Sequence, residues 1–238
     1  MVLSQEQIDS FHLKGFLNCG KLLEDDEIEI LREEYDKEMA IGDYGKLTGS
    51  ADPDSLIVKQ IMQMCERNMV FRKFIYNEKI LDVIQDLMGP NIQLFHDQAL
   101  YKSANDGGAT LWHQDNSYWK CHPASLISCW MTLDDVVEDQ GAMQYVPGSH
   151  LTPVRHHRSG GVLQDTILTD EQKASIEVVE VPAGHCILHH CQTLHFTKPN
   201  ITENQRRAFA IHFMTPGTIQ DENILSVSYK QPMLRMKH

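Results

Sequence analysis

The residues that could bind a metal ion stand in two short segments, LWHQDNSYW and HCILHHCQTLHF. In a β-strand, residues two apart point to the same face, so His113 and Asp115 would project together while Gln114 points away. An imidazole and a carboxylate on one face can supply two ligands to a divalent metal ion. An isolated H-x-D triplet also arises often by chance, so the first segment alone is equally well explained by a surface His and Asp at a strand end.

The second segment carries the histidines that could complete such a site, namely His185, His189, His190 and His195. Two histidines and one carboxylate that leave one face of the metal open form the ligand set of non-haem Fe(II) oxygenases. The remaining positions on the iron can accept a bidentate 2-oxo acid and dioxygen. Proximity alone leaves the choice among these histidines open.

The segment RRAFAIHFM follows the histidine cluster and reads as a β-strand. Its odd positions carry Phe209, Ile211 and Phe213, which should pack on a neighbouring layer. Its even positions carry two alanines, which leave room for a cavity into which Arg206 can reach. A planar guanidinium there would bind a carboxylate through two hydrogen bonds, so the alternation favours Arg206 over Arg207 as the anion-binding residue.

The elements that must position these residues change character along the chain. Before residue 91 the pattern predicts helices: one behind a Ser4–Gln7 capping box, one from Asp25 to just before Gly42, and one that ends at Gly89-Pro90. Between them, SLIVKQIMQM reads as a strand or a buried segment. After residue 91, short apolar or alternating runs recur between turn residues, and no βαβ alternation is present. We expect one domain over 1–238, with a helical part at 1–90 and a β core at 91–238.

Composition narrows the class of protein. The 238 residues are 42% hydrophobic and 23% charged with a net charge of −12, which is typical of a globular chain. We expect no nucleic-acid partner because no basic stripe is visible, and no membrane span because no apolar run is long enough. Without a leader pattern at the N-terminus, the expected location is the cytoplasm. The six cysteines form no CxxC pair and are expected to be free, buried thiols.

Several segments together resemble the phytanoyl-CoA dioxygenase-like family of Fe(II)/2-oxoglutarate oxygenases. The matching segments are QIDSFHLKGFL, GPNIQLFHDQALYK, WHQD, the run from Trp130 to Asp135, DQGAMQYVPGSH and LHFTKPNITENQRRAFAIHF. They follow in order over nearly the whole chain. The resemblance implies a double-stranded β-helix, a cupin-like jelly roll that is mainly β with flanking helices. It also implies the cofactors: Fe(II), 2-oxoglutarate as cosubstrate and O2, with a small organic molecule as the substrate.

The resemblance also assigns roles to individual residues. It makes His113, Asp115 and His195 the catalytic iron ligands, with Arg206 binding the distal carboxylate of 2-oxoglutarate. The other matched positions are Thr197, Trp130 and Tyr101 in the cosubstrate pocket, and Gln98 and Lys59 facing the substrate or the iron. The implied reaction oxidises a C–H bond, by hydroxylation or otherwise, while 2-oxoglutarate becomes succinate and CO2.

This chain departs from the family pattern at two places, and two other functions remain as alternatives. Gly184-His185 and Phe196-Thr197 stand where the family usually has Gly-Asp and Gly-Ser. The same ligands could hold Zn²⁺ in a hydrolase, although Arg206 then has no evident task. A catalytically silent binding barrel would lack part of the triad or the arginine, and all four residues are present. The basic run Arg155–Arg158 could recognise an anionic substrate or simply be a solvated loop.

Overall fold

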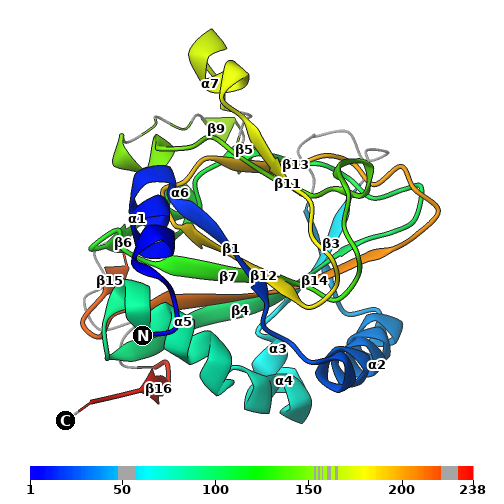
Figure 1. Cartoon of the computed structure of the whole chain (residues 1–238). Coiled ribbons are helices and arrows are strands. Elements are labelled where there is room, and N and C mark those ends of the chain that lie inside the picture. The colour runs from blue at the N-terminus through cyan, green and yellow to red at the C-terminus, as the bar shows by residue number, and fades with distance from the viewer. Residues whose placement is uncertain are drawn as a thin grey trace.

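The computed structural model describes residues 1–47, 57–152, 154, 156, 158–159, 162–163, 166–220 and 230–237. Two antiparallel sheets face each other across the centre of the molecule (Figure 1). The major sheet runs in the order β1 (Phe16–Lys21), β12 (His185–His190), β7 (Ile127–Thr132), β14 (Arg206–Met214), β4 (Ile92–Lys102), β3 (Val58–Met62) and β2 (Gly45–Leu47), with β16 (Met233–Arg235) also paired to β4. The minor sheet runs β11 (Glu177–Val179), β8 (Met143–Tyr145), β13 (His195–Thr197) and β5 (Thr110–His113). This arrangement is the double-stranded β-helix that the sequence predicts.

Helices cover the outer face of the major sheet, on the side away from the minor sheet (Figure 1). They are α2 (Asp25–Ile41), α3 (Met64–Arg67), α4 (Met69–Phe74) and α5 (Glu78–Met88), while α1 (Gln5–Lys14) leads into β1. The short elements are α6 (Asn116–Trp119), α7 (Asp170–Ala174), η1 (Glu138–Gln140), η2 (Ser149–Leu151), β6 (Cys121–His122), β9 (Arg158–Ser159), β10 (Val162–Leu163) and β15 (Ile219–Gln220).

The local signals that predict the first helices are present in the structure. The Ser4 hydroxyl accepts a hydrogen bond from the Gln7 amide, and the Gln7 side chain accepts one from Ser4, which completes the capping box. Helix α2 ends at Gly42, whose φ of 78° lies in the left-handed region. Helix α5 ends at Gly89, as predicted.

Alternation along β14 divides the interior into two packed regions. Phe209, Ile211 and Phe213 pack against the helices in the larger core. Ala208 and Ala210 face the space between the two sheets, where Trp130 lies beside them. Because β14 follows this two-residue period, one face of the major sheet packs against the helices and the other forms the wall of the site.

The N-terminal part is less purely helical than the sequence predicts. Three strands from before residue 91 belong to the major sheet, with β1 paired to β12 and β3 paired to β4. The pattern SLIVKQIMQM left strand and buried segment open, and the structure contains β3 there. The boundary at residue 90 therefore separates two stretches of one sheet rather than a helical layer from a β layer.

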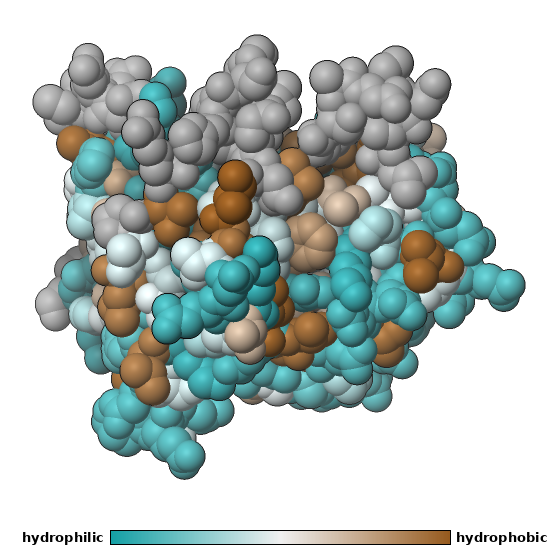
Figure 2. Space-filling model, turned by 90° about the horizontal axis from the view of Figure 1, so that it is seen from above, coloured by the Kyte–Doolittle hydropathy of each residue, from teal (hydrophilic) through white to brown (hydrophobic). Residues whose placement is uncertain are grey.

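The remaining surface and cysteine features are simple. All six cysteines are free thiols, and five of them are buried. Within the described residues, no helix is long and apolar enough to cross a membrane. In the view of Figure 2, hydrophobic side chains appear as separate patches between hydrophilic ones.

Candidate active site

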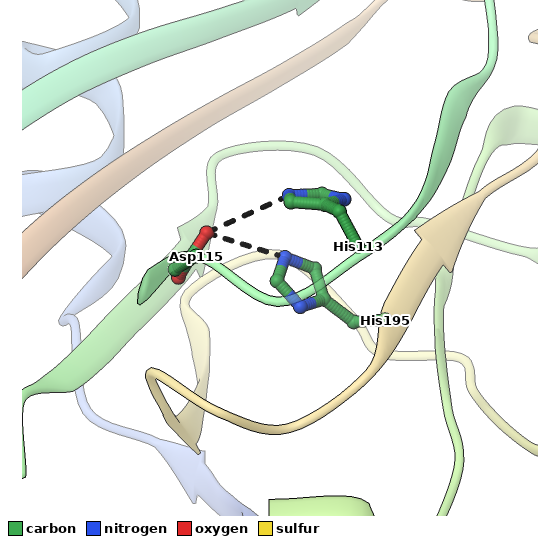
Figure 3. A group of neighbouring side chains, drawn as sticks. All are labelled: His113, Asp115 and His195. Atoms are coloured by element: carbon green, nitrogen blue, oxygen red, sulfur yellow. Dashed lines mark ion pairs between the residues drawn. The ribbon is translucent and has the colours of Figure 1, made fainter. Parts of the chain in front are cut away.

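His113, Asp115 and His195 converge between the two sheets (Figure 3). His113 ends β5 and His195 begins β13, and these two residues are direct partners in the minor sheet. One carboxylate oxygen, Asp115 Oδ1, lies 3.5 Å from His113 Nε2 and 3.6 Å from His195 Nε2. One ligand atom from each residue lies within 4.8 Å of the other two, and all three residues are buried. This spacing suits a single divalent metal ion.

The hydrogen bonds of the two histidines present the correct nitrogen to the centre of the triad. His113 Nδ1 lies 2.7 Å from the carbonyl oxygen of Leu111, and His195 Nδ1 lies 2.9 Å from that of Thr193. A carbonyl only accepts, so both Nδ1 atoms carry the proton and both Nε2 atoms keep a lone pair. Burial and the adjacent His113 hold the pKa of His195 well below its usual range, which keeps this imidazole neutral and able to bind a metal.

The second carboxylate oxygen of Asp115 is held by two donors. Ser128 Oγ donates to Oδ2 at 3.0 Å, and His189 Nε2 lies 3.2 Å from the same atom. Tyr145 donates in turn to His189 Nδ1 at 3.1 Å. Burial alone would raise the pKa of Asp115, but the neighbouring His195, His113 and His189, of which His189 donates to Oδ2, hold it well below the usual value. Oδ1 of an ionised carboxylate is therefore available as a ligand.

The other clustered histidines have separate places. His189 points inward but is bonded to Asp115, so it supports a ligand rather than completing the triad. His190 is its neighbour on β12 and points to the outer face, with its ring 5.4 Å from that of His150. The two-residue alternation of the strand thus places these two adjacent histidines on opposite faces of the sheet, which their proximity in the sequence could not predict.

A cavity of about 670 Å³ contains the triad and extends to Arg206. The Arg206 side chain is 1% exposed, and its Nε and Nη1 have no hydrogen-bond partner among the described residues. The Trp130 Nε1, also buried, lacks a partner within the same described set, and the guanidinium lies 5.6 Å from the Trp130 ring. Burial lowers the pKa of Arg206 to about 10, so the group stays cationic at neutral pH. A buried cation with free donors requires an anion, and a carboxylate fits it.

Thr197 lies in the same cavity, and a buried lysine stands behind it. Lys102 Nζ donates to Thr197 Oγ1 at 2.8 Å and also to the carbonyl oxygen of Lys198. Burial, with a smaller effect from Arg206, lowers the pKa of Lys102 to about 5, so the amine is neutral at pH 7. Because the Thr197 oxygen accepts from the lysine, its own proton is free to point toward an anion held by Arg206.

The two arginines of β14 point in opposite directions. Arg207 lies on the outer face, where it bonds to Asp134 at 2.6 Å and to Asp36 at 2.9 Å. The structure therefore places Arg206 in the cavity and Arg207 in an ion-pair network beside α2. This placement follows the alternation argued from the sequence.

Two sequence-matched positions do not reach the cavity. Lys59 and Tyr101 are direct partners across β3 and β4, and both point to the outer face of the major sheet. There the Lys59 ammonium lies 5.3 Å from the Tyr101 ring, and the Tyr101 hydroxyl donates to Gln205. The expectation that these residues line the cosubstrate and substrate pockets is therefore corrected, because the two-residue period gives their neighbours the inward positions. Gln98 does line the cavity.

Sequence reasoning missed several residues that shape the site. They are Lys102, Ser128, Tyr145 and Gln60. A usable signal existed for Lys102, because it shares the parity of Gln98 along one strand. Ser128 and Tyr145 carried no such signal, since their partners come from other strands. In the basic run, Arg155 and His157 lie outside the described residues, while His156 Nε2 bonds to Gln114 Oε1 at 3.1 Å.

The fold and the site define a metal-binding double-stranded β-helix with an anion pocket beside the metal ligands. The family model described as phytanoyl-CoA dioxygenase matches residues 11–208. The chain belongs to this family, and it is an Fe(II)/2-oxoglutarate-dependent oxygenase.

Individual relatives are similar to this chain in sequence, and solved structures are similar to it in fold. The chain is 25% identical to a phytanoyl-CoA dioxygenase domain-containing protein 1 homolog of Dictyostelium discoideum, over 90% of this chain and 92% of that protein. It is 27% identical to the peroxisomal phytanoyl-CoA dioxygenase of Homo sapiens, over 89% and 68%. Among solved structures, the epimerase SnoN in complex with Fe3+, alpha ketoglutarate and nogalamycin RO superposes with a TM-score of 0.84 at 18% identity, covering 97% of this chain and 98% of that one.

Proposed function

We propose that His113, Asp115 and His195 hold the catalytic Fe(II) of this oxygenase and that Arg206 binds the distal carboxylate of 2-oxoglutarate. The observation that carries this proposal is the buried Arg206 guanidinium, whose Nε and Nη1 find no partner among the described residues. It lies in the same cavity as the three metal ligands, so one dicarboxylate can reach both. The substrate is a small organic molecule, and one of its C–H bonds is oxidised.

The iron, when bound, couples the oxidative decarboxylation of 2-oxoglutarate to succinate and CO2 with oxidation of the substrate by O2. The protein residues supply orientation and charge. Arg206 offers two free donors to the distal carboxylate, and Thr197 offers its hydroxyl proton. Ser128 and His189 fix the rotation of the Asp115 carboxylate, so that Oδ1 stays directed at the centre of the triad.

The alternatives explain less of the cavity. A zinc hydrolase needs the triad and a water molecule, but it gives no task to the free donors of Arg206 and Trp130. A silent binding barrel would have no reason to keep two buried imidazoles and a buried carboxylate at ligand distance from one another. The oxygenase uses both sets of groups.

Relatives indicate a range of reactions rather than one substrate. Relatives are named for phytanoyl-CoA and for ectoine, and an epimerase and a carbocyclase are among the proteins of similar structure. We propose hydroxylation or another two-electron oxidation for this chain. We further propose that residues 1–238 act as one catalytic domain, because β1 and β3 pair directly with strands of the C-terminal part. The free thiols support our proposal of a cytoplasmic location.

The direct test is turnover of 2-oxoglutarate by purified protein with Fe(II) or with Zn(II). We expect succinate to form with iron and O2, and none to form with zinc or without O2. Hydrolase activity that depends on zinc, with no succinate under iron, would contradict the proposal. Binding of 2-oxoglutarate with no succinate under any metal would indicate a silent binding protein.

A further inference from the structure

Two glutamine side chains meet in the cavity wall, away from Arg206. Gln60 on β3 and Gln98 on β4 both line the cavity, and the Gln60 amide nitrogen donates to the Gln98 carbonyl oxygen. Gln98 Nε2 lies 2.9 Å from His212 Nε2. His212 Nδ1 lies 2.7 Å from Ser128 Oγ. These contacts form a continuous chain of hydrogen bonds that ends at Asp115.

The direction of this chain follows from its last member. The Ser128 hydroxyl donates its single proton to Asp115 Oδ2 at 3.0 Å, so this proton is not available to His212. The Ser128 oxygen therefore accepts from His212 Nδ1–H, and His212 Nε2 accepts from Gln98. This order fixes the Gln98 amide, with its nitrogen toward His212 and its oxygen toward Gln60.

Fixing both amides leaves a defined set of groups for a ligand. Gln98 retains one N–H, while Gln60 retains its carbonyl oxygen and one N–H. A donor and an acceptor therefore stand side by side in the wall, and Gln98 cannot rotate without breaking its bond to His212. Such a preorganised pair matches a ligand group that itself carries an acceptor beside a donor.

The surroundings of the amide pair favour an uncharged ligand. Trp119 packs against Phe95 with ring centroids 5.1 Å apart and against His96 at 5.3 Å, so this wall is aromatic. Burial lowers the pKa of His96 to about 4, which leaves its ring neutral at pH 7. Among the described lining residues, the charged side chains are Asp115, Arg206 and the exposed Lys46. The first two are engaged by metal and cosubstrate, so a charged ligand would lose hydration without gaining a buried counter-ion.

We propose that Gln60 and Gln98 bind the substrate of this oxygenase through an uncharged amide, lactam or similar donor–acceptor group, with an apolar ring system against Trp119. The inference rests on the proposed function, because it assigns the space that remains once Arg206 and the triad are occupied. The chain of hydrogen bonds through His212 and Ser128 fixes the position of Gln60 and Gln98 relative to the metal ligands.

The test uses three bicyclic probes that share a flat apolar body. They are the lactam 2-quinolinone, the anion 2-naphthoate and the cation 2-naphthylmethylammonium. Binding is measured by NMR titration on protein loaded with Zn(II) and 2-oxoglutarate, which cannot turn over. We expect 2-quinolinone to bind about tenfold more tightly than either charged probe, since only the lactam satisfies both amides without a desolvated charge.

Variants separate the amide pair from the rest of the cavity. We expect Gln60→Leu and Gln98→Leu each to weaken 2-quinolinone binding about tenfold. Gln220→Leu removes another amide from the same cavity and should leave this affinity unchanged. Among the described residues it is Gln98, not Gln60, that is hydrogen-bonded to His212, so Gln60→Leu decides the matter even where Gln98→Leu disturbs the metal site.

The affinity for 2-oxoglutarate is measured in the same samples. Failure of wild-type protein to bind 2-oxoglutarate would refute the proposed function itself. With 2-oxoglutarate bound, three outcomes overturn the substrate class: no measurable binding of 2-quinolinone, binding of 2-naphthoate at least as tight, or an unchanged affinity for 2-quinolinone in Gln60→Leu.

Discussion

At the residue scale, the two oxygens of Asp115 have different tasks. Oδ1 faces both triad histidines, while Oδ2 accepts from Ser128 and His189. A carboxylate without these donors could rotate or bind a metal through both oxygens. The four groups together therefore determine how one ligand is presented.

Removing a triad histidine should abolish metal binding, whereas removing its clustered neighbour should not. We expect His195→Ala to lose tight binding of Fe(II) or Co(II) and all succinate formation, because two ligands remain on the metal. His190→Ala is the matched control, since His190 points to the outer face. Calorimetric titration of the metal-free proteins measures both. Retained metal affinity in His195→Ala with loss in His190→Ala would refute the ligand assignment.

Replacing the two adjacent arginines should have different effects, one on cosubstrate affinity and the other on stability. Arg206→Ala should weaken 2-oxoglutarate binding by about 2–5 kcal/mol, the usual cost of truncating a buried charge pair. Arg207→Ala should leave that affinity nearly unchanged and lower the free energy of unfolding instead, because it removes the bonds to Asp134 and Asp36. Cosubstrate titration and urea denaturation of both variants provide the comparison. Equal losses of cosubstrate affinity would contradict the assignment.

Lys102 should make stability depend on pH in an unusual range. Its pKa is lowered to about 5 in the folded protein, whereas an unfolded lysine has a pKa of about 10.4. Between these values the unfolded chain binds the extra proton, so the free energy of unfolding rises with pH. Lys102→Met should reduce this rise by up to about 1.4 kcal/mol per pH unit between pH 7 and 9. Denaturation curves at the two pH values test it, and parallel behaviour of wild type and variant would refute a neutral Lys102.

At the element scale, strand β14 contributes both to the hydrophobic core and to the cavity. Its odd residues hold the helices in place, and its even residues form the floor of the cavity. The small side chains of Ala208 and Ala210 leave space beside Trp130, and Arg206 lines the cavity from the same face of the strand. One strand thus contributes to the stability of the protein and to ligand binding, with different side chains for each.

Enlarging the inner face should impair binding, and trimming the outer face should impair stability. Ala210→Leu adds bulk to the cavity floor, so we expect weaker 2-oxoglutarate binding in protein that remains folded. Ile211→Ala should lower the free energy of unfolding by about 2–5 kcal/mol and keep the cosubstrate affinity of the folded fraction. Thermal denaturation and cosubstrate titration of both proteins form the test. A loss of stability in Ala210→Leu together with a loss of cosubstrate affinity in Ile211→Ala would contradict the assignment of the two faces of β14.

How far the sequence could predict the structure depends on the range of each interaction. Helix α2 and its Gly42 terminus follow from local spacing, and the faces of β14 follow from strict alternation. Lys59 could not be placed in this way, because its direction relative to Gln98 depends on how β3 pairs with β4. The contact of Ser128 on β7 with Asp115, which precedes α6, also joins two elements whose relative position local spacing does not give. Register between distant strands is set by the packed fold, and a single sequence does not display it.

At the scale of the whole molecule, the space between the sheets holds many uncharged bases. Burial lowers the pKa of His212 well below its usual value and that of His96 to about 4. On the other face of the major sheet, burial lowers the pKa of His190 to about 4 as well. Keeping these groups neutral allows them to pack beside one another and beside aromatic rings. The fold therefore excludes protons from these imidazoles at neutral pH.

This exclusion predicts that the metal-free protein loses stability in mild acid. Histidines in the unfolded chain have a pKa of about 6.5. Below that pH the unfolded chain therefore binds protons that the buried histidines of the folded protein do not bind. Stability is therefore complete above pH 6.5 and falls as the pH drops toward 4, by up to about 1.4 kcal/mol per pH unit for each such histidine. His190→Gln isolates one contribution away from the triad, and it should flatten the slope between pH 6.5 and 5 by up to that amount. Urea denaturation of the metal-free proteins across this range measures it. An unchanged slope in His190→Gln would show that this imidazole becomes protonated in the folded state, and that its burial does not hold it neutral.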